Sequence, residues 1–294
     1  MTYSTQVNRL FSIVFGEKIQ KHFENIILVL AGLGFLIHLL LIVLKTNNIG
    51  FLSEINSSLL NDPITAIYTP FSLILIYEVY LLVFYLPRSF TSCVSKQFEI
   101  ISLIVIRKIF KDIPQMDLQG DWYLSQHNLE LIVDLIGFLL LFLLIYLFNV
   151  GKNRLPKKVF KDHKLLNFIS SKKAVSLVLL FLLMITSTYS LVTWLMHVFA
   201  DGYVSNVDSV FFNQFFTLLI LTDVIILLIS FRYTEEYSKL IRNTGFIIAT
   251  ILIRLSFSAD GFLNIILILT GVGFALLILQ IFNAMENPKP DSTA

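Results

Sequence analysis

The sequence predicts an all-α fold, a polytopic bundle of transmembrane helices with about eight spans. Of its 294 residues, 56% are hydrophobic and 14% are charged, whereas about 25% of the residues in an average soluble domain are charged. The mean hydropathy is +0.80. Long apolar runs recur along the chain, and the basic residues gather between them. This is the pattern of a multi-pass membrane protein whose orientation is set by its basic loops.

Six runs are apolar and long enough to cross a bilayer, which takes about 20 residues of helix. They are Asn25–Leu44, Ala66–Leu86, Leu129–Phe148, Ala174–Phe199, Phe211–Phe231 and Phe262–Met285. A further segment, Leu240–Phe257, is interrupted by Arg242 and Arg254 but is still long enough to cross.

The loops predict the orientation. The segment Gly151–Lys173 is strongly basic, with Asp162 as its single acidic residue. A short basic loop stays in the cytoplasm, whereas the acidic segment Ala200–Asp208 suits the outer side. Topology control accounts for the loop's charge, and contact with anionic lipids or a partner protein is the alternative. The residues concerned are Arg154, Lys157, Lys158 and Lys161.

The segment Phe90–Ile113 decides the number of crossings. It contains charged residues, among them Arg107 and Lys108, and a charge at the membrane centre is costly. If its neighbours shield it, the chain crosses eight times and both termini are cytoplasmic. If it lies along the membrane surface, the chain crosses seven times and the N-terminus is outside. We favour eight crossings, because the basic loops then lie on one side.

The rest of the chain forms one domain with short additions. Residues 1–24 mix apolar side chains with Arg9 and Lys18, as in an amphipathic helix on the membrane surface, and packing on the bundle is the alternative. Residues 25–285 form the transmembrane domain. Residues 286–294 are polar, and we expect a disordered cytoplasmic tail.

Several functional classes are excluded or disfavoured. Cys93 is the only cysteine, so neither an intrachain disulfide nor a thiolate metal site is expected. No zinc, phosphate-loop or serine-hydrolase motif occurs, so we expect no cofactor, metal or catalytic residue. The net charge of +2 gives no reason to expect nucleic-acid binding.

The expected partners are the bilayer, anionic lipids, and a second copy or partner subunit. Compact loops suit a bacterial inner (plasma) membrane.

Buried carboxylates are the best candidates for function, because ionisable groups at depth tend to line paths or pair with one another. Glu78 and Asp223 each lie about 18 Å of helix rise from the outer end of their runs. Carboxylates at one depth can share a proton. Alternatively, each is hydrogen-bonded locally. Asp134, nearer the outer end of its run, is a candidate for the outer approach.

Two basic groups accompany these acids. Arg254 lies near an outer turn, where its side chain can snorkel to the surface. Alternatively, it is a buried counter-charge to Asp223. His38 lies within an apolar run, where it acts either as a hydrogen-bonded packing residue or as a proton relay.

These observations predict a transport protein, either a proton- or ion-linked transporter or a channel. One alternative is a non-transporting membrane subunit that binds a partner or anionic lipid through its basic loops. A third is a membrane-embedded enzyme, for which Trp122, His127 and Glu130 are the only polar grouping at one interface.

Overall fold

The computed structural model describes residues 3–47, 63–113, 125–154, 163–201, 207–233, 236–259 and 261–286, which are mostly helical and include no strand. The elements are α1 (Tyr3–Val14), α2 (Glu17–Thr46), the 3₁₀ helix η3 (Pro63–Ile67), α3 (Tyr68–Phe84), α4 (Phe90–Asp112), α5 (Gln126–Asn153), α6 (His163–Asp201), α7 (Val207–Tyr233), α8 (Tyr237–Ser256) and α9 (Phe262–Glu286).

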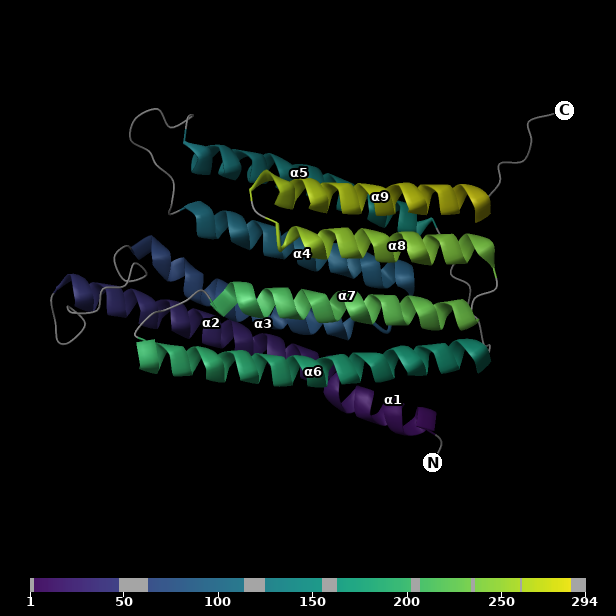
Figure 1. Ribbon diagram of the computed structural model, residues 1–294, viewed down its shortest axis with the longest axis horizontal. Coiled ribbons are helices and arrows are strands. Elements are labelled where there is room, and N and C mark those ends of the chain that lie inside the picture. The colour runs from purple at the N-terminus through teal and green to yellow at the C-terminus, as the bar shows by residue number, and fades with distance from the viewer. Residues whose placement is uncertain are drawn as a thin grey trace.

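The long helices lie side by side in two layers (Figure 1). In one layer, α2, α3, α4 and α5 pack in chain order, and in the other α6, α7, α8 and α9 do the same. The layers meet where α5 packs against α9, α4 against α8 and α3 against α6. Successive long helices run in opposite directions, so the start of α1 and the end of α9 lie at the same end of the bundle (Figure 1).

Six helical segments are long and apolar enough to cross a membrane, which confirms the predicted class of apolar helical protein. They are Gln6–Thr46, Pro63–Phe84, Gln126–Asn153, Leu166–Thr186, Gln214–Tyr233 and Phe262–Glu286. The apolar runs found in the sequence fall on these helices. The two remaining long helices, α4 and α8, carry more charge, and they pack against each other between the layers.

Helix α4 lies inside the bundle, between α3 and α5 and against α8. It begins at the turn after Pro87, where the Ser89 side chain accepts a hydrogen bond from the Ser92 backbone N–H at 3.3 Å, an N-cap contact. Its buried apolar residues include Phe98, which is fully buried, and Ile101. The neighbours therefore cover most of α4, as the shielded interpretation of this segment requires.

Helices α8 and α9 form a tight pair. Gly261 takes φ +59° in the turn between them, a left-handed conformation that glycine adopts without steric cost. Asn264 Nδ2 then donates a 2.8 Å hydrogen bond to the Ser256 carbonyl at the end of α8. Farther along, a Cβ on Gly271 would lie 2.7 Å from Ile253 Cγ1 and 2.9 Å from the Ala249 carbonyl oxygen. The two backbones approach this closely only because Gly271 has no side chain.

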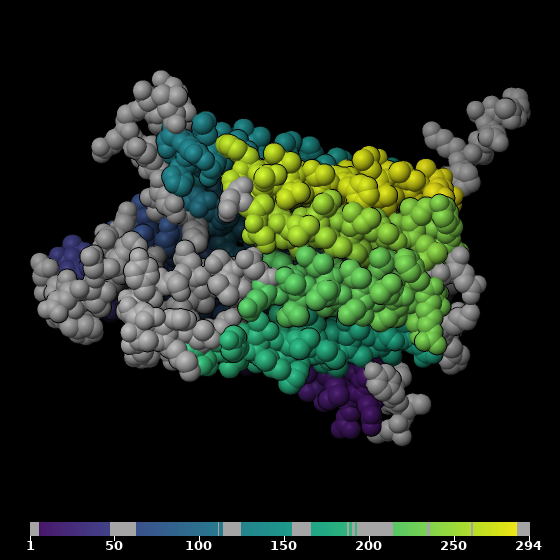
Figure 2. Space-filling view, viewed as in Figure 1, coloured from purple at the N-terminus to yellow at the C-terminus, as the bar shows by residue number. Residues whose placement is uncertain are grey.

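The N-terminal helix packs on the bundle. Val7 is buried, and Lys173 Nζ on α6 donates a 2.8 Å hydrogen bond to Asn8 Oδ1. Leu10 and Ile13 remain exposed, and α1 projects from the side of the bundle (Figure 2). Helix α1 thus contacts α6, while residues 17–24 belong to α2.

Two expected boundaries differ from the structure. Helix α2 begins at Glu17, earlier than the expected start at Asn25, because the Gly16 backbone separates α1 from α2 and the polar first turns still form helix. Helix α6 begins at His163, so residues 163–173 are helical although the sequence placed them in a loop. The expected tail at 286–294 lies, apart from Glu286, outside the described residues.

We expect Gly271→Ala to destabilise the protein, because its methyl group meets a backbone carbonyl that cannot move aside. The loss should be about 1–3 kcal/mol of unfolding free energy, measured by denaturant titration in a bilayer mimic. Gly273→Ala is the matched control, since a Cβ at Gly273 has nothing within 4 Å. Equal stability of the two variants would show that the α8–α9 contact is looser than described.

Candidate functional site

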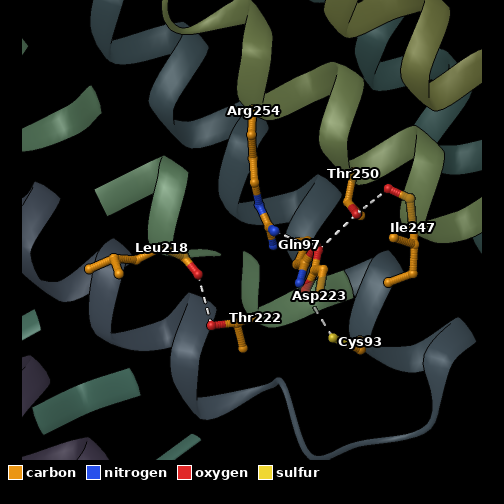
Figure 3. Close-up of polar contacts among 8 residues, drawn as sticks. All are labelled: Cys93, Gln97, Leu218, Thr222, Asp223, Ile247, Thr250 and Arg254. Carbon is orange, nitrogen blue, oxygen red and sulfur yellow. Dashed lines mark hydrogen bonds and ion pairs between the residues drawn. The ribbon is translucent and has the colours of Figure 1, made fainter. Parts of the chain in front are cut away.

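The most deeply buried charges meet where α7 and α8 adjoin. Asp223 on α7 is 3% exposed and Arg254 on α8 is 2% exposed. Arg254 Nη1 donates to Asp223 Oδ2, which forms a buried ion pair (Figure 3). Thr250 lies one helical turn before Arg254, so both side chains share a face of α8. Its hydroxyl lies 2.9 Å from the same carboxylate oxygen and 2.9 Å from the Ile247 carbonyl.

Helix α4 contributes a polar edge to this pair. Arg254 Nη2 lies 3.4 Å from Gln97 Oε1, and Gln97 Nε2 in turn donates to Cys93 Sγ at 3.4 Å. Both residues of α4 are buried and lie beside Asp223 (Figure 3). Thr222, although adjacent to Asp223 in sequence, bonds back to the Leu218 carbonyl of its own helix (Figure 3). The contact between Gln97 and Arg254 joins the two layers of helices.

A small cavity lies beside this network. Its polar lining comes from Cys93, Gln97, Lys172, Asp223 and Thr250, and the remaining walls are apolar. The space open to the centre of a water molecule is about 10 Å³, close to the minimum for one bound water. The cavity lies between α4 of one layer and α6, α7 and α8 of the other, so a change in the spacing of the layers would change its volume.

Lys172 on α6 is the second cation at this cavity. It is 2% exposed, and its ammonium group donates to the Arg88 carbonyl at 2.5 Å. The ammonium lies 4.6 Å from the ring centroid of Phe90, a cation–π distance. Among the residues that the structure describes, no carboxylate forms an ion pair with Lys172. Together with Asp223 and Arg254, the cluster holds two cations and one carboxylate when all are ionised.

Glu78 lies in a different place, between α3 and α4. It is 3% exposed, and Arg107 Nη1 approaches its Oε2 to 2.9 Å. The same guanidinium nitrogen donates to the Phe71 carbonyl at 3.1 Å, and Glu78 Oε2 receives no well-aligned hydrogen bond from the described residues. Glu78 and Asp223 are thus paired with different arginines, and no hydrogen bond or ion pair joins the two carboxylates within the described ranges.

Asp134 and His38 have partners of their own. Lys108 Nζ on α4 lies 2.9 Å from Asp134 Oδ2 on α5, and the carboxylate is buried while the lysine is partly exposed. His38 Nδ1 on α2 lies 2.6 Å from Thr69 Oγ1 on α3. Arg107 and Lys108 are consecutive in the chain, so α4 forms ion pairs with the helices on both of its sides. The His38 contact is a hydrogen bond between α2 and α3, as expected of a packing residue.

The basic loop is only partly described. Arg154 is exposed at the end of α5, whereas Lys157, Lys158 and Lys161 lie outside the described residues, as does Trp122. Glu130, also considered for an interfacial site, accepts a 3.1 Å hydrogen bond from Gln126 on the same helix.

Lys172 and Gln97 were not predicted as site residues from the sequence. Lys172 was assigned to the basic loop, yet it is four residues before Ser176 and seven before Leu179, and all three are buried on one face of α6. This helical spacing was a usable signal. For Gln97, the sequence shows only a polar residue in a charged segment, and nothing in it indicates contact with Arg254.

Arg254 itself is buried and paired with Asp223, so it does not snorkel to the surface.

No protein-family model matches the chain, and no curated protein or solved structure is significantly similar to it.

We expect Arg254→Met to destabilise the protein by about 3–5 kcal/mol, because it leaves the Asp223 carboxylate buried without its counter-charge. Adding Asp223→Asn should restore much of that loss, since no unpaired charge then remains. Denaturant titration of the two single variants and the double variant measures the coupling.

The partly exposed pair of Lys96 and Glu99 on α4 provides the control, because both side chains are about 40% exposed. Lys96→Met should change the stability by less than about 1 kcal/mol. Additive effects of the Arg254 and Asp223 substitutions would contradict the described pair.

Proposed function

We propose that the chain is an integral membrane transport protein, a carrier that moves protons together with a second ion. The observation that carries this proposal is the Asp223–Arg254 pair, which lies beside a small cavity with both polar and apolar lining at the junction of the two helix layers. Stability alone does not explain a buried ion pair well, since well-packed apolar residues in its place often make a protein equally or more stable. An intramembrane ionisable group next to a polar cavity is a reason to infer function.

Asp223 is the proposed proton-binding group. Both contacts to its carboxylate are made at Oδ2, from Thr250 and Arg254. Within the described part of the chain no hydrogen bond reaches Oδ1, so a proton can bind there without displacing either donor. Protonation would weaken the attraction that joins α7 to α8, and it would thereby couple proton binding to the packing of the bundle.

We further propose eight crossings, α2 to α9, with both termini in the cytoplasm of a bacterial cell. The long helices run alongside one another, and the start of α1 and the end of α9 lie at one end of the bundle (Figure 1). The basic segment between α5 and α6 is connected at that same end, which supports a cytoplasmic assignment. Compact connections and a single cysteine suit a bacterial inner membrane.

A small cavity supports a carrier more than a channel. Space for about one water molecule suits a site that holds one small ion better than it suits a continuous pore. In carriers of known mechanism, one group of helices moves against another around a central site. Here the two layers offer such groups, since α4 meets α6, α7 and α8 at the cavity.

Proton flux into proteoliposomes tests the proposal. The wild type should carry an inward proton flux under an imposed pH gradient, and Asp223→Asn should abolish it because the amide cannot bind the proton. Lys96→Met, which alters an exposed charge on α4, is the control and should keep the flux.

Two outcomes would contradict this assignment. Loss of flux in Glu78→Gln, with full flux in Asp223→Asn, would move the proton path to the Glu78–Arg107 pair between α3 and α4. Absence of flux in folded wild-type protein, at any gradient, would favour a non-transporting subunit that binds a partner or anionic lipid through its basic loops.

A further inference from the structure

We propose that the cavity beside Asp223 binds a small monovalent anion of halide size, and that this anion is the second ion carried with the proton. The inference rests on the proposed transport function and names its substrate class. Its basis is the charge of the cluster and the kind of polar groups around the cavity.

The charges favour an anion. Lys172 and Arg254 carry two positive charges, and Asp223 supplies one negative charge, so the cluster has a net positive charge when all three are ionised. All three side chains are nearly inaccessible, with exposed fractions of 2%, 2% and 3%. Screening by water is weak at such sites, so the excess positive charge repels cations and attracts an anion.

The geometry leaves Lys172 available to a ligand. Its ammonium group has three N–H donors, and among the described residues it has one hydrogen-bond acceptor, the Arg88 carbonyl. Phe90 and Phe168 lie within cation–π distance of the same group, at 4.6 and 5.6 Å. Lys172 lines the cavity together with Thr250, whose single hydroxyl hydrogen is already directed at Asp223 or the Ile247 carbonyl, so Lys172 is the donor available to an anion. The space suits an ion close to water in size, and larger carboxylates or phosphates would need the layers to separate.

Proton binding and anion binding should help each other. The titratable or charged groups facing Asp223 are Cys93 on α4, Lys172 on α6 and Arg254 on α8. When the carboxylate takes up a proton, the guanidinium of Arg254 loses its counter-charge. An anion in the cavity replaces that charge, so one proton and one anion restore the original balance. By linkage, the anion then raises the affinity for the proton by the same factor.

Radiolabelled chloride binding in detergent-purified full-length protein tests this inference, with a chloride-free buffer as the starting state. The wild type should bind chloride more tightly at acidic pH than at neutral pH, because protonation of Asp223 removes a negative charge from the cluster. Asp223→Asn should bind it tightly at every pH, because its amide mimics the protonated carboxyl group. Bromide should also raise the melting temperature of Asp223→Asn more than that of the wild type, which reports binding even if that variant is less stable.

Lys172→Met is the decisive variant, and its neighbour provides a matched control. Chloride binding should weaken by about a factor of ten or more when the buried ammonium group is removed. Lys173→Met should leave chloride binding unchanged, because Lys173 points to α1 and donates to Asn8. Unchanged binding in Lys172→Met would overturn the assigned site.

The result also separates this inference from the proposed function. Proton flux that depends on Asp223 but needs no chloride, in protein that binds none, would overturn the anion inference and leave proton transport in place. Chloride binding that depends on Lys172, without any proton flux, would support the site and reject coupled transport. If the folded wild-type protein shows neither proton flux nor chloride binding, both proposals are rejected.

Discussion

Most buried charges among the described residues have a counter-charge on a neighbouring helix, because an isolated charge in a low-dielectric interior is costly to retain, and Lys172 is the exception. Three pairs satisfy that constraint. Glu78 with Arg107 joins α3 to α4, Asp134 with Lys108 joins α4 to α5, and Asp223 with Arg254 joins α7 to α8. Helix α4 takes part in two of these pairs, and Gln97 brings it to the third. The most highly charged long helix is therefore also the one with the most polar contacts to its neighbours.

The three pairs are not equivalent. Glu78–Arg107 and Asp134–Lys108 lie within one layer, where they fix neighbouring helices to each other. Asp223–Arg254 also joins two helices of one layer, but Gln97 of the other layer contacts Arg254, and Asp223 lines a cavity that Lys172 also lines. Under the proposed function, this pair, with the second cation beside it, is the one that responds to a proton or an anion. The other two pairs would hold α4 in place during that response.

Much of the fold could be predicted from the sequence, because a membrane span is a one-dimensional pattern. The run Phe262–Met285 matches α9 almost residue for residue, and Leu129–Phe148 falls within α5. The ion pairs could not be predicted, since they depend on how each helix is rotated about its axis. Asp223 and Glu78 have similar depths in their runs, yet they face different partners. The similar depths of the two carboxylates therefore predicted one shared site, but the rotations of α3 and α7 about their axes direct the two side chains to different partners.

Lys172 shows a second limit of the sequence. Its position in a cluster of basic residues favoured a loop, whereas the buried face that it shares with Ser176 and Leu179 extends α6 to His163. That prediction gave more weight to the many basic residues around Lys172 than to the helical spacing of the buried residues. The number of crossings was left open for a related reason: the charges of α4 argue against a span until their partners on α3 and α5 are known.

The central claim is that α4 lies within the bilayer, with its charges paired inside the bundle, and a spin label on its exposed face tests this most directly. Leu103, which is 51% exposed near the middle of α4, is the position to label, in a protein whose buried Cys93 is replaced by alanine. Collision rates with oxygen and with a water-soluble nickel complex then report the surroundings of the label. We expect frequent collisions with oxygen and few with nickel, and the reverse for a label at the exposed Glu236 between α7 and α8. Frequent nickel collisions at Leu103 would mean that α4 lies at the aqueous surface, which would contradict the eight-crossing account.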